Sequence, residues 1–265
     1  MEQDVLIKSV DGYVGTITLN RPERRNALSP ELLMELHFTL SAWAESGQVR
    51  CVVITGAGDK AFSSGYDISA IPTDLTPEME DLIRNHNPLE LAFNSIRNFP
   101  YPVIAMWNGY CYGAGMNLSI CCDIRIAADT AKAGMPPARL GLVYHPDGLR
   151  QFVEALGFAA TRELFLTART FTATECLEMG LVNHVIPLEQ LQSWTMNLAR
   201  DTASNAPLSM KHMKRILNLL GQGVGLSGDD LAEAERLVRE GFASDDLKEG
   251  QLAFLEKRKP NFQGK

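Results

Sequence analysis

Residues 102–115 have the sequence PVIAMWNGYCYGAG, an apolar run followed by a turn that contains three glycines. The apolar part, residues 102–106, is typical of a strand buried on both faces of a parallel sheet. The glycine-rich part, residues 108–115, predicts a tight turn that opens a helix ending near Cys122. The first backbone N–H groups of a helix have no partner within it. This stretch therefore predicts a buried strand with unpaired N–H donors at its end.

Apolar runs on both sides of this stretch extend the pattern. Residues 51–55 and 124–128 predict two more buried strands, and residues 5–19 predict a hairpin. Apolar residues recur at helical spacing over about residues 30–45 and 89–98. Because strands and helices alternate, we expect an α/β core.

The chain from Gly148 onward is predicted to be nearly all helical, with a single strand over residues 181–185. Residues 71–88 carry three prolines and mixed charge, which indicates a surface excursion. We therefore expect an α/β core over residues 1–200 and a helical region over residues 201–265. The helices predicted after Gly148 span about residues 148–156, 159–165, 172–179, 188–204, 207–220, 228–242 and 245–257.

The composition narrows the classes of function. The chain has 265 residues, is 45% hydrophobic and carries a formal charge of −7, which disfavours nucleic acid as a partner. No apolar run approaches the roughly 18–20 residues of a membrane span, and the start resembles no targeting signal, so we expect a cytoplasmic protein without membrane contact. The five cysteines lack metal-ligand spacing, which indicates reduced thiols and no metal site.

A second glycine turn follows the strand at residues 51–55. Residues 61–68 (AFSSGYDI) resemble residues 108–115 in placing glycine where a strand ends. If the two turns face each other, they can supply two N–H donors to one oxygen. The alternative is that these glycines only permit close packing. A nucleotide site is disfavoured, because the third glycine of a dinucleotide fingerprint is missing and no Walker sequence is present.

Several stretches jointly resemble the crotonase (enoyl-CoA hydratase/isomerase) superfamily, in the same order and over the whole chain. They are residues 20–28 (NRPERRNAL), 52–58, 61–68, 102–123, 139–142 (RLGL) and 253–262 (AFLEKRKPNF). The resemblance implies an α/β crotonase fold with a repeated ββα spiral core and a C-terminal helical trimerisation region. It also implies an acyl-CoA substrate with no further cofactor, and self-association to a trimer or a dimer of trimers.

The resemblance implies roles for individual residues. The backbone N–H groups of Tyr66 and Ala114 would hold the thioester oxygen and stabilise an enolate. Arg24 and Arg25, which the residues alone would indicate to be an exposed basic pair, would lie near the CoA phosphates. Lys257 would reach CoA, in many relatives that of a neighbouring subunit. The other implied CoA- and substrate-binding residues are Ala27, Ser64, Gly65, Asp67, Ile68, Gly113, Asn117, Pro136 and Pro137.

The chain departs from the superfamily's hydratases at their two glutamates. Asn117 stands where one glutamate is expected, and Pro137 stands where the other is expected. Neither residue can transfer a proton, so hydration by a glutamate pair is disfavoured. The resemblance is closest to the methylmalonyl-CoA decarboxylase-like branch, which has a tyrosine aligned with Tyr144. That branch keeps a glutamate where Asn117 stands and has a histidine where Tyr66 stands.

Decarboxylation suits a site without these glutamates, because loss of carbon dioxide from a malonyl-type thioester forms the enolate directly. Tyr144 is then predicted to orient the departing carboxylate, and His145 to protonate the α-carbon. A packing role for Tyr144 and a surface position for His145 are the alternatives. Asp67, Asp123 and Asp147 are predicted to brace turns.

The leading hypothesis is an acyl-CoA lyase that decarboxylates a small malonyl-type CoA ester. The first alternative is an enoyl-CoA isomerase or atypical hydratase that uses His145 or Asp147 as its single acid/base group. A non-catalytic scaffold or binding protein is a second alternative, which the two glycine turns disfavour.

Overall fold

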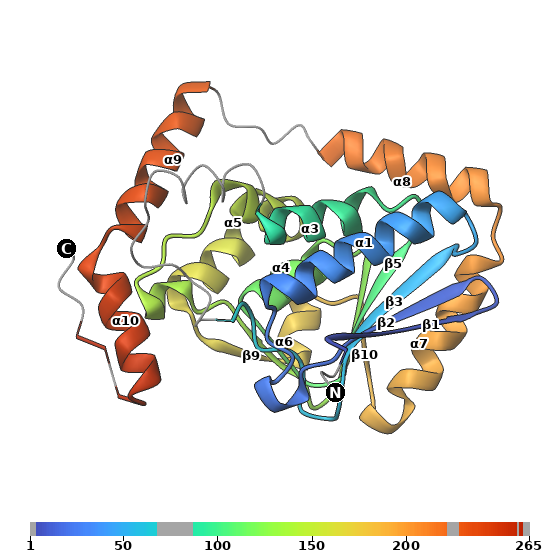
Figure 1. The fold of residues 1–265 in the computed structure, drawn as a ribbon, viewed down its shortest axis with the longest axis horizontal. Coiled ribbons are helices and arrows are strands. Elements are labelled where there is room, and N and C mark those ends of the chain that lie inside the picture. The colour runs from blue at the N-terminus through green and yellow to red at the C-terminus, as the bar shows by residue number, and fades with distance from the viewer. Residues whose placement is uncertain (1–3, 68–86, 222–227, 259, 262–265) are drawn as a thin grey trace.

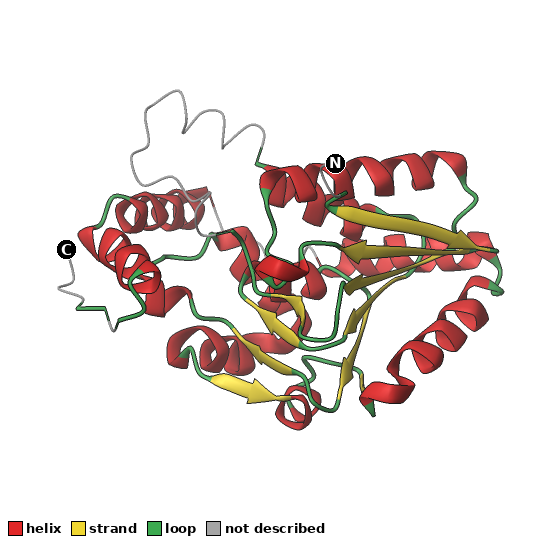
Figure 2. Cartoon of the chain, turned by 60° about the horizontal axis from the view of Figure 1, so that its bottom comes forward, coloured by secondary structure: helices red, strands yellow, loops and turns green. Residues whose placement is uncertain are grey.

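The computed structural model describes residues 4–67, 87–221, 228–258 and 260–261. Its strands form two sheets with helices packed around them (Figure 1) (Figure 2). The larger sheet has the order β1 (Leu6–Asp11), β2 (Val14–Leu19), β3 (Cys51–Gly56), β5 (Val103–Trp107), β7 (Ile124–Ala128) and β10 (His184–Ile186). The smaller sheet has the order β4 (Ala61–Ser63), β6 (Tyr110–Tyr112), β8 (Lys132–Gly134) and β9 (Thr170–Thr172).

The centre of the larger sheet is parallel and buried, as the apolar runs predict. β3 pairs with β5 and β5 with β7, and every residue of β3 and β5 is buried. β1 and β2 form the predicted antiparallel hairpin, and Gly12 at its turn has a φ of 58°. Glycine adopts this left-handed conformation without the steric cost of a side chain.

Each inner strand of the larger sheet leads into a strand of the smaller sheet. β3 is followed by β4, β5 by β6 and β7 by β8, and these three short strands pair in parallel. A Cβ on Gly109, between β5 and β6, would lie 2.3 Å from the carbonyl oxygen of Lys60 before β4. The glycine therefore permits two successive turns to stack. This repetition is the predicted ββα spiral.

The helices of the core are α1 (Pro30–Ser46), α3 (Pro88–Asn98), α4 (Ala114–Ile120), α5 (Pro146–Thr167), α6 (Ala173–Glu178) and α7 (Leu188–Ala203), with short 3-10 turns η1 (Pro22–Arg24) and η3 (Pro137–Leu140). The hydroxyl of Ser29 accepts a hydrogen bond from the N–H of Leu32 and caps α1. α1 packs against α3, whereas α7 packs across β3, β5 and β7. The part of the predicted excursion before residue 87 lies outside the described residues.

Two expectations after Gly148 are wrong. β9 is a second strand in this region, and its buried Phe171 pairs with Ala133 of β8. A three-residue strand is too short for its periodicity to be recognised. β10 begins at His184 rather than at Leu181, because the N–H of Leu181 closes the turn after α6 on the carbonyl of Cys176.

The two helices predicted over residues 148–156 and 159–165 are confirmed as the two parts of α5. Gly157, with a non-helical φ of 73° and ψ of 172°, separates them at a kink. The last three helices, α8 (Pro207–Gly221), α9 (Gly228–Phe242) and α10 (Asp245–Leu255), confirm the predicted C-terminal helices. α10 packs closely on η3, since a Cβ on Gly250 would lie 2.3 Å from the carbonyl oxygen of Leu140. The division at residue 200 stays a prediction.

All five cysteines are buried and free, as expected. Burial raises the pKa of the Cys51 and Cys121 thiols to about 12, which keeps them protonated. Within the described ranges, no helix combines the length and the apolar character that crossing a membrane requires. The cytoplasmic location stays a prediction.

Lys214 anchors α8 to the core through one buried ammonium group. Its Nζ donates to Asp123 Oδ2 at 2.6 Å and to the carbonyl oxygen of Tyr101 at 3.0 Å. Asp123 Oδ2 also accepts from the N–H of Val103 at 2.7 Å, so this carboxylate braces a turn as predicted. Only 9% of the Lys214 side chain is exposed, so loss of the ammonium would leave these acceptors without a donor.

We expect Lys214→Met to lower the free energy of unfolding by about 2–4 kcal/mol, because it breaks a largely buried ion pair. Lys211→Met, which alters an exposed lysine of the same helix, is expected to change it by less than about 0.5 kcal/mol. Urea unfolding of both variants measures the difference. Equal stabilities would show that α8 does not depend on this contact.

Candidate functional site

The two glycine turns predicted from the sequence lie against each other. Gly65 has a φ of 104° and Gly113 a φ of 52°, both in the region that favours glycine. A Cβ on Gly65 would lie 3.1 Å from the carbonyl oxygen of Tyr112 and 3.5 Å from the nitrogen of Ala114. The backbones of the two turns therefore lie close together, and a side chain at Gly65 would be both crowded and strained in its φ.

This approach brings two backbone N–H groups to one place. Tyr66 forms a parallel bridge with Leu28, in which the N–H of Leu28 donates to Gly65 and the N–H of Asp67 donates to Leu28. The N–H of Tyr66 points away from that bridge. Ala114 is the first residue of α4, so its N–H has no acceptor within the helix. Neither N–H has a hydrogen-bond partner among the residues that the structure describes.

The loop before α1 is braced by a cation that the sequence analysis does not single out. Arg21 donates to Asp67 Oδ2 at 3.0 Å and to the carbonyl oxygen of Ala27 at 2.8 Å. This ion pair confirms that Asp67 braces a turn. Arg24 and Arg25 are exposed beside it, at the end of η1, where they are accessible to a phosphate.

The buried side chain of Asn26 also holds this loop. The sequence did not single this residue out, because an asparagine in a loop is ordinary. Its side chain is fully buried, and its Nδ2 donates to the carbonyl oxygens of Ala57 at 3.0 Å and Ala61 at 2.7 Å. Its Oδ1 accepts from the N–H of Arg21 at 3.1 Å. These bonds connect the basic loop to the turn that carries Tyr66.

Asn117, in the first turn of α4, is in contact with Tyr144, which precedes α5. The Tyr144 hydroxyl donates to Asn117 Oδ1 at 2.7 Å, and Asn117 Nδ2 donates to Gln151 Oε1 at 2.6 Å. Cys121 donates to the same Gln151 oxygen at 3.3 Å. Gln151 was missed from the sequence, because nothing in its spacing distinguishes it. The result is a neutral hydrogen-bonded chain between α4 and α5.

Burial raises the pKa of Tyr144 well above its ordinary value of 10, so the phenol is protonated at any working pH. Its ring also packs edge-on against Phe165, with centroids 5.1 Å apart. Tyr144 can therefore donate a hydrogen bond but cannot serve as a base.

His145 begins α5 and lies in a group of titratable side chains. Its Nδ1 accepts from the N–H of Asp147 at 3.4 Å and lies 3.7 Å from Asp147 Oδ2. Glu90, in the first turn of α3, completes the group, because one side-chain atom from each residue lies within 4.8 Å of the others. Sequence reasoning missed Glu90, since an acidic residue in the first turn of a helix is ordinary. His145 is partly exposed, as the surface alternative expects.

The group of Glu90, His145 and Asp147 lies at the N-terminal ends of α3 and α5, and Ala114 lies at the N-terminal end of α4. Glu90 faces His145 where α3 and α5 begin, and Arg97 pairs with Glu154 two turns further along both helices, at 2.9 Å. α3 and α5 therefore run in the same direction. A Cβ on Gly148 would lie 3.1 Å from Asn117 Oδ1, and Cys121, just after α4, donates to Gln151 further along α5. α4 is therefore also parallel to α5.

The remaining predicted residues lie around these turns. Ser64 donates its hydroxyl to the carbonyl of Arg24, and Pro137 is buried at the start of η3, after Pro136. Lys257 is exposed just after α10, with a φ of 55°. Ile68 lies outside the described residues.

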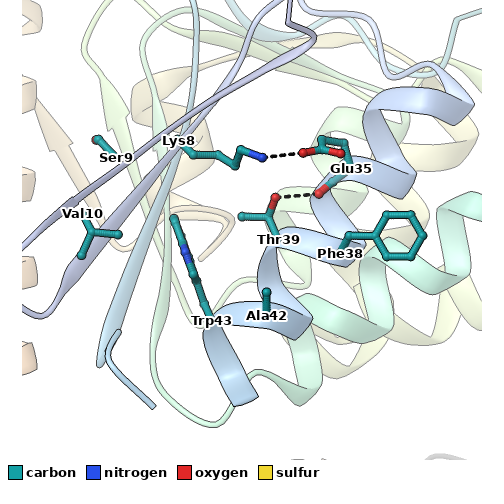
Figure 3. A pocket seen from close by; sticks show the side chains of 8 residues that line it. All are labelled: Lys8, Ser9, Val10, Glu35, Phe38, Thr39, Ala42 and Trp43. Atoms are coloured by element: carbon teal, nitrogen blue, oxygen red, sulfur yellow. Dashed lines mark hydrogen bonds and ion pairs between the residues drawn. The ribbon is translucent and has the colours of Figure 1, made fainter. Parts of the chain in front are cut away.

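One cavity of the described chain lies away from these turns. It is a shallow groove of about 410 Å³ between β1 and α1, and Lys8 pairs with Glu35 at 2.5 Å across it (Figure 3). None of the predicted site residues lines it. The two facing turns therefore define the candidate site on their own.

Comparison with known proteins gives one family. The model of the family described as "Enoyl-CoA hydratase/isomerase" matches residues 10–265. Methylmalonyl-CoA decarboxylase of Escherichia coli (strain K12) is 33% identical over 261 residues, which cover 95% of this chain and 98% of that protein. A short-chain-enoyl-CoA hydratase of Clostridium acetobutylicum is also 33% identical, over 98% of this chain and 97% of its own length.

A solved structure shows the same overall arrangement. Methylmalonyl-CoA decarboxylase in complex with 2-nitronate-propionyl-CoA superposes with a TM-score of 0.92 at 31% identity, over 100% of both chains. Because a decarboxylase and a hydratase are equally identical to this chain, overall similarity does not choose between the two reactions. The choice depends on the site residues.

We expect Tyr144→Phe to lower the free energy of unfolding by about 1–3 kcal/mol, because it leaves the buried Asn117 Oδ1 without a donor. Tyr110→Phe, which alters an exposed ring, is the matched control and is expected to change it by less than about 0.5 kcal/mol. Thermal and urea unfolding measure both. A Tyr144 variant as stable as the control would contradict the hydrogen-bonded chain.

Proposed function

Because the chain belongs to the enoyl-CoA hydratase/isomerase family, we propose that it is an acyl-CoA lyase that decarboxylates a small malonyl-type thioester. The observation that carries this proposal is the contact between Tyr144 and Asn117. A neutral hydrogen-bonded pair occupies the place where a glutamate of a hydratase would act, and Pro137 replaces the second glutamate. The site therefore has donors for an anion and lacks the two carboxylates that would activate a water.

The N–H groups of Tyr66 and Ala114 are proposed to hold the thioester oxygen. Their turns approach closely, and neither N–H is engaged elsewhere in the described chain. Donors fixed in this way stabilise the negative charge that develops on an enolate oxygen, and one such donor contributes about 2.7–4 kcal/mol in the transition state. Because loss of carbon dioxide itself forms the enolate and its negative charge, no base is needed to remove a proton from the α-carbon.

Tyr144 is proposed to bind the departing carboxylate. In the free protein its only proton is donated to Asn117. A carboxylate is a stronger acceptor than an amide oxygen, so a bound substrate can draw the phenol proton toward itself. The hydroxyl would then return to Asn117 as carbon dioxide leaves, which makes Asn117 a resting partner for Tyr144.

His145 is proposed to protonate the α-carbon of the enolate. The bond from the α-carbon to the carboxylate breaks, its electron pair forms the enolate, and one proton from His145 restores the saturated thioester. The donor form is the imidazolium, which carries a proton on each ring nitrogen and becomes neutral when one proton is transferred. With Nδ1 accepting from the N–H of Asp147, the neutral ring that remains carries its other proton on Nε2.

Arg24, Arg25 and Lys257 are proposed to bind the CoA phosphates, and the backbone from Ser64 to Ile68 the adenine and pantetheine. The proposed role of the two arginines is supported by their exposure beside the loop that the Asn26 side chain holds. The acyl part would lie near Ala27, Gly65, Gly113 and Pro136, close to the two turns.

An enoyl-CoA isomerase or atypical hydratase is the second candidate. The group formed by Glu90, His145 and Asp147 supports it, because it supplies an acid/base group that does not depend on the missing glutamates. The equal identity to a short-chain-enoyl-CoA hydratase supports it as well.

We also propose that the chain assembles into a trimer or a dimer of trimers through its C-terminal helices. α8 exposes Leu208, Met213, Ile216 and Leu217, and α10 exposes Leu252, Phe254 and Leu255. Apolar side chains gathered in this way are typical of a surface that another subunit covers.

We expect carbon dioxide release from methylmalonyl-CoA and no loss of enoyl absorbance from crotonyl-CoA. His145→Ala is expected to slow product formation by about 10²–10⁴ where protonation limits the rate. Asn117→Glu is expected not to produce efficient hydration, since Pro137 leaves the second position empty. Rapid hydration of crotonyl-CoA by the unmodified protein would reject the decarboxylase in favour of the second candidate.

Multi-angle light scattering at micromolar concentration is expected to give three or six times the chain mass of 29.2 kDa. Leu217→Glu on α8 places charge on the proposed interface and is expected to shift the mass downward, whereas Lys211→Glu on the same helix is a control that replaces a residue already charged. A stable monomer of the unmodified protein would contradict the assembly.

A further inference from the structure

We propose that Glu90 is a positioning residue for the reaction, which acts through the nearby His145 imidazole and returns a proton to it after each turnover. This inference rests on the proposed function of His145 as the proton donor. Nothing in the sequence pattern singles Glu90 out, and the comparisons assign it no role.

The placement of Glu90 is the first support. It is in the first turn of α3, where Asn87 Oδ1 accepts from the N–H of Leu89 and caps the helix. One oxygen of Glu90 lies within 4.8 Å of both the His145 nitrogen and an Asp147 oxygen, across the boundary between α3 and α5. Because the two helices run in parallel, Glu90 reaches His145 from an element that does not carry it.

The nearby arginines pair with carboxylates other than Glu90. Asp147 is 3.6 Å from Arg150, and Arg150 also pairs with Glu154, which Arg97 neutralises from α3. Those two arginines are therefore engaged with Asp147 and Glu154 along the helices. On the described elements that meet here, Glu90 and Asp147 are the carboxylates facing the imidazole.

The environment of Glu90 suits proton exchange. Half-burial raises the pKa of Glu90 above its ordinary value, the nearby Asp147 raises it further, and His145 acts in the opposite direction. A carboxyl with a raised pKa holds a proton at higher pH than an exposed glutamate does. Glu90 can therefore store a proton for His145 and be refilled from water.

The proton balance of decarboxylation requires such a supply. Each turnover removes one proton from the protein, because the α-carbon keeps it when carbon dioxide leaves. After donation, His145 is neutral, and a proton passes from the Glu90 carboxyl to the imidazole while water restores the carboxyl. Nδ1 lies 3.4 Å from the N–H nitrogen of Asp147 and 3.7 Å from Asp147 Oδ2, so a donor for the neutral ring and a carboxylate for the protonated ring are both close to the same nitrogen.

The test is a double-mutant cycle of Glu90→Gln and His145→Gln, with pH profiles of kcat. We expect Glu90→Gln to lower kcat by about tenfold, with little change in KM, and to remove one ionisation from the profile. Because Glu90 acts through His145, the double variant is expected to be no slower than His145→Gln alone. Glu90→Asp should restore part of the rate. Glu31→Gln, which removes a carboxylate from the first turn of α1, is the matched control.

An independent measurement separates this inference from the proposed function. Carbon-13 NMR titration of the Glu90 carboxyl needs no substrate, and we expect its midpoint to rise in His145→Gln. An unchanged midpoint would overturn the pairing even if the protein decarboxylates malonyl thioesters. If the Glu90 midpoint rises in His145→Gln but no carbon dioxide is released, the pairing of Glu90 with His145 is supported and the decarboxylase function is rejected. If the losses in kcat of the two single variants multiply in the double variant, the proposal is also overturned. Binding of Mn²⁺ or Zn²⁺ at micromolar concentration that Glu90→Gln abolishes would overturn it as well.

Discussion

The close approach of the Gly65 turn to the nitrogen of Ala114 is the constraint on which the candidate site depends. It follows from the parallel pairing of β3 with β5 and of β4 with β6, which brings two successive turns to the same edge. A side chain at Gly65 would meet the backbone of the neighbouring turn. The fold therefore produces two adjacent N–H donors before any catalytic side chain is chosen. This explains why one scaffold can support decarboxylases and hydratases at equal sequence identity.

Two kinds of polar group surround these donors, and they differ in charge. Tyr144, Asn117 and Gln151 form a neutral, buried chain whose hydrogen bonds fix its geometry. Glu90, His145 and Asp147 form a partly exposed group of acid and base side chains. The first group can bind an anion without exchanging protons, whereas the second can exchange protons with water. A decarboxylase needs both properties, since it binds a carboxylate and then consumes a proton.

The sequence predicts the strands that build the core, because apolar runs such as residues 51–55 and 102–106 are buried on both faces. It also predicts the two turns, since their glycines precede or follow those runs. It does not predict β9 or the start of β10, which are too short for periodicity to show. Glu90, Gln151 and Arg21 were missed for another reason: each acts through a partner distant in the sequence, and its residue type is ordinary where it stands. Asn26 is similar, because its three buried hydrogen bonds become visible only when the loops have folded together.

The arrangement is one in which a family scaffold without either glutamate keeps the two N–H donors that the proposed reaction needs. An enolate held by two N–H groups has the same electronic demand whether it forms by loss of a proton, addition of water or loss of carbon dioxide. The reactions differ in what must deliver or accept the proton. Replacing a glutamate by Asn117 removes a charge that would repel a substrate carboxylate, and it gives Tyr144 a neutral partner that a carboxylate can displace. In the proposed reaction, the substitution that disfavours hydration therefore also leaves an uncharged partner beside Tyr144 where a malonyl-type carboxylate would bind.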